Sequence, residues 1–223
     1  MPLLFLRRCG WLGLLTCVLT ACGSHTKAPP AFTASGYVAD GGAVRLWRKD
    51  DRAQQTVNIV SVYSPYQGEN TVITRYQFLR EDVRQITRTQ NGEHPLTVQI
   101  RFDEQGNPSY MQRQRDGIRE KLSDDELALY VFEARRLLDV SKTLRAGQVK
   151  LVQANWRNGV MVTCDGKQVK PDLDERSISW IAARAHHSTG QLGVAWLEAP
   201  EGTQLLLVAN EDFCHWQPKK SEL

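Results

Sequence analysis

The chain has 223 residues, of which 41% are hydrophobic and 24% are charged, as in an ordinary globular protein. These values exclude a disordered chain, a collagen-like chain and a membrane protein with several spans. A chain of this length buries roughly 70% of the surface that its unfolded form exposes, so we expect it to fold without a cofactor. The formal net charge of +3, from 28 basic and 25 acidic residues, is too small to favour nucleic acid as a partner.

Residues 1–21 have the features of a lipoprotein signal peptide. Arg7 and Arg8 precede an apolar run over residues 9–19, which has the length of an h-region and is too short to span a bilayer. The run ends in Leu19-Thr20-Ala21-Cys22, which resembles a bacterial lipobox. We therefore expect Cys22 to be the lipidated first residue of the mature protein, anchored to a membrane without spanning it. The alternative, an N-terminal spanning or buried helix, is disfavoured by the short run.

The residue after Cys22 favours the outer membrane over the inner membrane. Gly23 replaces the aspartate that resemblance to enterobacterial lipoproteins would associate with retention in the inner membrane. We therefore expect the periplasmic face of the outer membrane, with exposure at the cell surface as the alternative. Removal of the signal also removes two arginines and no acidic residue, which leaves the mature chain with a net charge of +1.

The mature chain is expected to contain a tether, one body and a tail. Residues 22–36 are small, polar and proline-containing, which predicts a flexible tether. Residues 37–216 are expected to form a single globular domain. Residues 217–223 are polar and are expected to fray.

Residues 37–122 alternate polar and apolar side chains between turn signals, which predicts an antiparallel meander. Val98, Ile100 and Phe102 share one face of a strand, while Gln99 and Arg101 share the other. One face of the sheet should therefore be buried, and we call it the dry face. The other should be exposed to solvent, and we call it the wet face. The expected strands are 43–49, 56–63, 71–79, 83–89, 96–102, 109–115 and 117–121.

Residues 123–146 have the strongest helix signal in the chain. Ser123 and Glu126 form a capping box, and Gly147 follows as a stop signal. An apolar stripe at helical spacing has to pack on a partner, and the dry face of the meander is the natural one. The stripe contains Leu127, Tyr130, Val131, Ala134, Leu137, Leu138 and Ser141.

The remaining chain completes an α+β fold. Strands are expected at 148–156 and 159–164, followed by a C-terminal β-hairpin of 192–197 and 203–210. Residues 177–187 fit a strand or a helix, and the helix is favoured. The predicted architecture is an antiparallel sheet, either open or closed like a barrel. This sheet packs on one long helix over about 123–146.

Cys164 and Cys214 are the two cysteines of the expected body, because two others lie in the signal and one carries lipid. An even pair in an oxidising compartment favours a disulfide, which would stabilise the fold by about 4 kcal/mol. The alternative is a metal site that also uses His186, His187 or His215. No HExxH or CxxC spacing supports such a site, so we expect no metal.

Catalytic motifs are missing from the expected body. Residues 37–216 contain no G-x-S-x-G, no S-x-x-K and no glycine-rich phosphate loop. We therefore favour a non-catalytic binding or envelope-assembly module whose partner is an envelope protein or a lipid. The alternative is a periplasmic hydrolase with His186 or His187 as base, which requires a serine or carboxylate within hydrogen-bond reach of the imidazole.

Four arginines alternate with apolar residues and could share the wet face as an anion-binding surface: Arg75, Arg101, Arg113 and Arg115. Acidic residues are interleaved in the same stretch, so an ordinary face of mixed charge is the alternative and the commoner case. These acidic residues are Glu81, Asp82, Asp103, Glu104, Asp116 and Glu120.

Several strings in the chain resemble the YjaH-like lipoproteins of enterobacteria and vibrios. They are Leu19–Cys22, Gly36–Asp40, Val44–Asp50, Ser61–Tyr66, Tyr110–Gln114 and Glu133–Arg136, and they extend over nearly the whole mature chain. That family has no assigned molecular function. The resemblance therefore implies a lipoprotein and supplies no catalytic residue.

Overall fold

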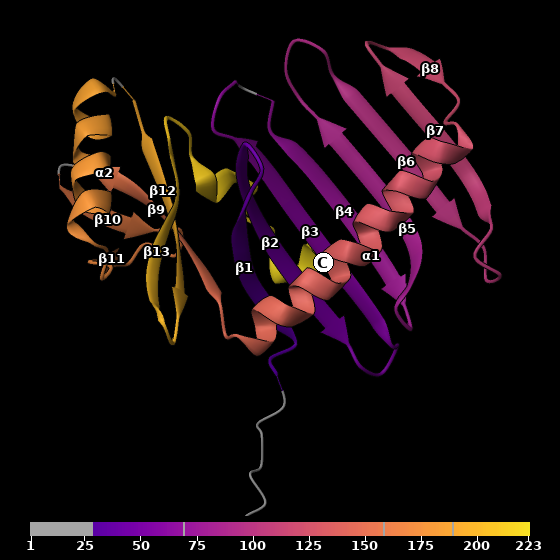
Figure 1. The fold of residues 1–223 in the computed structure, drawn as a ribbon, viewed down its shortest axis with the longest axis horizontal. Coiled ribbons are helices and arrows are strands. Elements are labelled where there is room, and N and C mark those ends of the chain that lie inside the picture. The colour runs from indigo at the N-terminus through magenta and orange to yellow at the C-terminus, as the bar shows by residue number, and fades with distance from the viewer. Residues whose placement is uncertain (1–28, 69, 158, 189) are drawn as a thin grey trace, which may run out of the picture.

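A computed structural model describes residues 29–223 except 69, 158 and 189. The expected signal peptide and Cys22 lie outside the described residues. Within that part of the chain, thirteen strands form two antiparallel sheets, accompanied by two α-helices (Figure 1). No helix in this part is both long enough and apolar enough to cross a bilayer.

The first sheet is an eight-stranded meander in which each strand pairs with the next along the chain. Its strands are β1 (Phe32–Ala39), β2 (Gly42–Asp51), β3 (Thr56–Pro65), β4 (Val72–Leu79), β5 (Asp82–Gln90), β6 (Leu96–Phe102), β7 (Pro108–Arg115) and β8 (Ile118–Glu120). The meander follows from the alternating pattern and the short turns. β1 begins at Phe32, within the segment expected to be tether.

The long helix α1 (Asp124–Ala146) lies diagonally across one face of this sheet (Figure 1). Its capping box is confirmed, because Glu126 N donates to Ser123 Oγ at 3.2 Å and Ser123 N donates to Glu126 Oε2 at 2.9 Å. The predicted stripe is buried at Ala134, Leu137 and Leu138. It packs on a core that includes Leu46, Ile59, Phe78, Ile86, Val98 and Ile100.

The second sheet has the order β11-β10-β9-β12-β13. Its strands are β9 (Lys150–Arg157), β10 (Val160–Thr163), β11 (Gln168–Val169), β12 (Leu192–Ala199) and β13 (Gly202–Ala209). The predicted C-terminal hairpin is confirmed as β12 and β13. Residues 177–187 belong to a helix, α2 (Glu175–His187), as favoured from the sequence.

The prediction of a single sheet, either open or closed like a barrel, is wrong. Within the described residues β1 and β8 are the outer strands of an open sheet, and β9 to β13 form a separate sheet. The physical reason lies in β12, whose residues Leu192 to Leu197 are all buried. Such a strand needs cover on both faces. Ile181 of α2 packs with one side of β12, while Ala43 of β2 packs with Ala195 on the other.

The C-terminal segment packs on the face of the first sheet that is opposite α1. It contains the short helices η1 (Phe213–Trp216) and η2 (Lys220–Glu222). Trp216 and Leu223 contact a buried cluster of Trp47, Val60 and Val62 from β2 and β3. The structure therefore does not show the expected fraying of residues 217–223, because the apolar side chain of Leu223 packs against the sheet.

Candidate functional site

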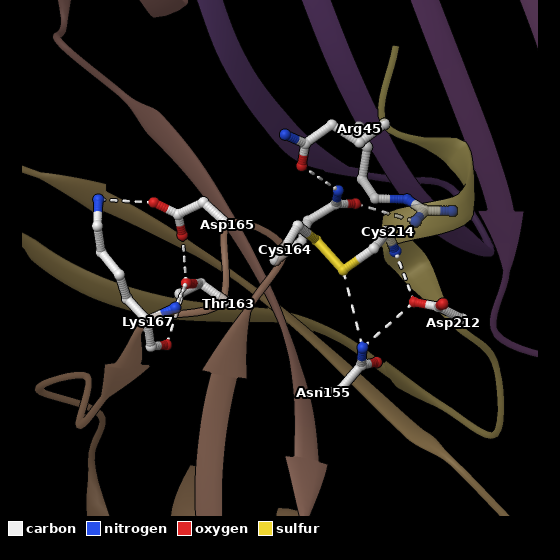
Figure 2. Close-up of a disulfide and its surroundings, with 10 residues drawn as sticks. Arg45, Asn155, Thr163, Cys164, Asp165, Lys167, Asp212 and Cys214 are labelled. Carbon is white, nitrogen blue, oxygen red and sulfur yellow. Dashed lines mark hydrogen bonds and ion pairs between the residues drawn. A yellow bond between two sulfur atoms is a disulfide. The ribbon is translucent and has the colours of Figure 1, made fainter. Parts of the chain in front are cut away.

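The predicted disulfide joins Cys164, which follows β10, to Cys214 in η1, with an S–S distance of 2.05 Å (Figure 2). Next to it, Asn155 Nδ2 donates to Asp212 Oδ1 at 3.3 Å, and Asp212 caps η1. Both sulfur atoms are used in the bond, so they are not available as metal ligands. Within the described residues, no three His, Cys, Asp or Glu side chains form a group that could hold a metal.

A buried arginine lies beside the disulfide. Arg45 of β2 is 0% exposed and donates to Ser64 Oγ at 2.9 Å and to Gln153 Oε1 at 3.1 Å. Its guanidinium also lies 4.5 Å from the ring centroid of Phe213 in η1. Burial lowers the pKa of Arg45 to about 10, although the negative charge of Glu211 opposes that shift. Arg45 thus ties the two sheets and η1 together.

The histidines proposed as a base in the hydrolase alternative lie at the C-terminal end of α2. Both His186 and His187 are exposed, and their ring centroids are 5.2 Å apart. Among the hydrogen bonds of the described residues, none joins either imidazole to a serine or a carboxylate. The geometry therefore gives the hydrolase alternative no support.

The middle of α1 packs closely on the first sheet. Ala134 is 0% exposed, Leu137 5% and Leu138 3% against the sheet. This packing counts against a lipid bound under that part of the helix.

Open clefts lie elsewhere in the described structure. One of about 270 Å³ lies nearer the N-terminal half of α1 and is lined by Val83, Phe102 and Val131. Others lie at the junction of the two sheets, such as one of about 350 Å³ beside Tyr66 and Trp180.

The strand register divides the four predicted arginines between the two faces of the first sheet. Arg113 lies on the side of α1, where it forms ion pairs with Glu120 and with Glu126. Arg115 lies two residues after Arg113 on β7 and therefore on the same side of the sheet. Arg75 and Arg101 lie on the opposite face, because the residues beside them, Tyr76 and Ile100, point into the core under α1. The four side chains therefore do not form one surface.

The face of β4 to β8 opposite α1 has a composition of its own, and we call it the open face. α1 covers the other side of these strands (Figure 1), whereas within the described residues the open face is bordered only at β4, by Glu222 and Leu223 of the C-terminal segment. Cross-strand pairing places twelve polar side chains on it. They are Arg75, Gln77, Gln85, Thr87, Thr89, Thr97, Gln99, Arg101, Tyr110, Gln112, Gln114 and Arg119.

The side chains of the open face contact one another. Tyr110 Oη donates to Gln112 Oε1 at 2.6 Å, and Gln85 Nε2 donates to Thr87 Oγ1 at 3.3 Å. The Arg101 guanidinium lies 5.7 Å from the ring centroid of the 40% exposed Tyr110. These contacts join neighbouring polar groups within β5, within β7 and between β6 and β7.

The twelve side chains of the open face include three arginines and no carboxylate. Among the ion pairs of the described residues, none involves Arg75, Arg101 or Arg119. The interleaved acidic residues lie at or beside turns, or pair with Arg113 in the case of Glu120. Glu222 borders the face beside Arg75, where the C-terminal segment ends. Arg119 is not among the arginines expected from the sequence, because its place on this face depends on its pairing with Gln114.

Fold and site together define a mainly β protein with two packed antiparallel sheets and one polar sheet face left open. The family model described as "Protein of unknown function (DUF1481)" matches residues 34–219, and the chain belongs to this family. It is 41% identical over 205 residues to "Uncharacterized protein YjaH" of Escherichia coli (strain K12), which covers 91% of this chain and 87% of that protein. The resemblance found in the sequence is thereby confirmed. No solved structure gives a significant match.

Proposed function

We propose that the protein is a lipoprotein, anchored through Cys22 in the outer membrane, whose body is a binding module on the periplasmic side. The observation that carries the binding role is the open face, whose twelve polar side chains include no carboxylate and which the C-terminal segment borders only at β4 in the described structure. A solvent-exposed surface usually mixes charges of both signs. A face that departs from this rule is a candidate for recognition.

The anchor is supported by the lipobox and by the length of chain that follows it. Ten residues lead from Cys22 to Phe32, where β1 begins. Even when fully extended, ten residues reach at most about 35 Å. An anchored body therefore stays close to the membrane and to whatever else is attached there.

Membrane fractionation tests the anchor. The protein should partition into detergent and sediment with outer membranes, whereas Cys22→Ala should remain unprocessed and without lipid. Gly23→Asp keeps the acylated cysteine and should move the protein to the inner membrane. Release of the unaltered protein in soluble form, or identical behaviour of Cys22→Ala, would overturn the anchor.

Chemical cross-linking in intact envelopes tests the binding role. The unaltered protein should be recovered with a cross-linked envelope component, and the double variant Arg101→Glu, Arg119→Glu should lose it. Arg115→Glu, an exposed arginine on the other face of the same sheet, is the matched control and should retain it. Equal recovery with all three proteins would contradict a binding role for the open face.

A further inference from the structure

We infer that the open face binds an anionic polysaccharide, a chain of sugar rings that carries carboxylate or phosphate groups. This ligand class deepens the binding role proposed above and rests on that role. It follows from the geometry of the face, its hydrogen-bonding groups and its charge, together with the poorer fit of other ligands.

The first observation is the regular spacing of the polar groups. Neighbouring strands lie about 4.8 Å apart, and residues two apart on one strand are separated by about 6.8 Å. Rows of paired residues cross the sheet, such as Arg75, Thr87, Gln99 and Gln112. Over β4 to β8 this gives a platform of about 19 by 14 Å. A platform of this size can hold several linked sugar rings lying flat.

The second observation is the kind of hydrogen-bonding group. A sugar hydroxyl both donates and accepts hydrogen bonds, and so do the glutamine amide and the threonine hydroxyl. Eight of the twelve side chains are of these two types: Gln77, Gln85, Thr87, Thr89, Thr97, Gln99, Gln112 and Gln114. The face can therefore match hydroxyl groups in many orientations.

The third observation is the charge. Arg75, Arg101 and Arg119 are exposed, and a guanidinium can bind a carboxylate or a phosphate through two parallel hydrogen bonds. Tyr110 holds the Arg101 guanidinium near its ring and offers an exposed aromatic surface to a sugar. Apart from Glu222 at the β4 border, the charged side chains of the face are arginines, which favours an anionic chain over a neutral one.

Other classes of ligand fit the face less well. The centre of a stable protein interface is apolar, whereas the centre of this face holds Thr87 and Gln99. A membrane surface is bound by clustered basic residues together with apolar side chains that insert, and Tyr110 is the one aromatic side chain among the twelve. Duplex nucleic acid calls for a denser positive charge than three arginines among twelve residues.

Binding of defined polymers to the full-length protein, purified with its anchor in a non-ionic detergent, tests the inference. The probes are polygalacturonate, which has both hydroxyl and carboxylate groups, dextran, which has hydroxyl groups alone, and polyglutamate, which has carboxylates alone. After removal of the detergent, vesicles with and without phosphatidylglycerol test an anionic membrane, because the lipid anchor inserts into both kinds. We expect polygalacturonate to bind at least about tenfold more tightly than either other polymer, and we expect phosphatidylglycerol to leave vesicle binding unchanged.

Charge-reversal variants locate the site. Arg101→Glu combined with Arg119→Glu should weaken polygalacturonate binding by at least about tenfold, because each change replaces an attraction by a repulsion. Gln99→Glu, at the centre of the face, should also weaken it. Arg115→Glu is the matched control on the side of α1 and should change the affinity by less than about twofold.

Several outcomes would overturn the inference. Equal binding of polyglutamate would show simple attraction to any polyanion, and equal binding of dextran would show that charge has no role. A preference for vesicles with phosphatidylglycerol over vesicles without it, abolished by Arg101→Glu combined with Arg119→Glu, would assign the face to a membrane.

If polygalacturonate does not bind but an envelope protein is cross-linked at the open face, the polysaccharide is excluded while the proposed binding role survives. If polygalacturonate binds but Cys22 proves to carry no lipid, the anchor fails and the ligand class stands.

Discussion

At the scale of single residues, buried ionisable groups connect the elements of the core. Arg48 donates from Nη1 to Ser141 Oγ at 2.7 Å and pairs through Nε with Asp50 Oδ1 at 2.7 Å, which joins β2 to α1. Tyr76 lies under α1, where burial, together with the negative charge of Glu133, raises its pKa to about 12. The Tyr76 hydroxyl couples stability to pH because burial disfavours its ionised form.

The raised pKa of Tyr76 predicts a loss of stability at alkaline pH. Below pH 10 the hydroxyl is protonated in both the folded and the unfolded state. Above pH 10 the unfolded tyrosine ionises, whereas the folded one keeps its proton up to about pH 12, so the contribution to stability is lost as pH rises. Between pH 8.5 and pH 10.5 we expect this loss to be about 0.8 kcal/mol.

Urea unfolding of Tyr76→Phe at these two pH values measures that contribution. The difference in unfolding free energy between the variant and the unaltered protein should shift by about 0.8 kcal/mol in favour of the variant. Tyr110→Phe, at the exposed tyrosine of the open face, is the control and should show no such shift. If the difference in unfolding free energy between Tyr76→Phe and the unaltered protein is the same at both pH values, ionisation of Tyr76 does not contribute to the pH dependence of stability.

At the scale of elements, α1 follows from local sequence signals and its position follows from packing. Ser123 and Glu126 begin the helix through reciprocal hydrogen bonds, and its buried side faces the core of the first sheet. Arg88 of β5 adds an ion pair to Glu133 at 3.2 Å. Because exposed ion pairs contribute little, burial of the stripe stabilises the packing of α1 on the sheet more than this ion pair does.

Truncation of one stripe residue should therefore destabilise the protein strongly. Leu138→Ala removes a side chain that is 3% exposed, and the cavity and the lost burial should cost about 3 kcal/mol. Leu129→Ala on the same helix is the matched control, because Leu129 is 56% exposed, and it should cost less than about 0.5 kcal/mol. Similar urea midpoints for the two variants would show that α1 is not held by this stripe.

At the scale of the whole molecule, the two sheets are joined by close packing and by one covalent bond. Gly36 of β1 lies against Leu197 and Leu206 of the second sheet, and a Cβ added there would come within 2.6 Å of Val44 O. The disulfide links residues separated by 50 positions, from the end of β10 to η1. Together with Arg45, it holds the C-terminal segment where it borders the open face.

Loss of the disulfide should weaken the fold without changing its core. The combined variant Cys164→Ala, Cys214→Ala should lose about 4 kcal/mol, because a crosslink over this length of chain restricts the unfolded state. Urea unfolding measures the loss, and reductant added to the unaltered protein should lower its midpoint in the same direction. A midpoint that is unaffected by both changes would contradict a stabilising role for the bond.

Much of the architecture could be predicted because its signals are local. The capping box of α1, the apolar stripe, the hairpin turn between β12 and β13 and the alternation in β6 each lie within a short stretch of chain. In β7 the alternation alone does not orient the strand, because Tyr110 and Met111 are adjacent and lie on opposite faces. Arg113 follows the alternation of Met111, which packs on the core. The prediction that the four arginines share one face is therefore wrong, because two of them lie on each face.

The sequence by itself determined α1 and most of the strands, with β1 and β11 as exceptions, favoured the pairing of Cys164 with Cys214, and indicated membership of the family. Only the tertiary structure decided that the strands form two sheets, that the tail packs on the first of them, and that the acidic residues are absent from the open face. The physical reason is that periodicity acts along a few residues, whereas the sharing of a face depends on register between strands. A one-residue difference in alternation moves a side chain to the opposite face, as Arg113 illustrates.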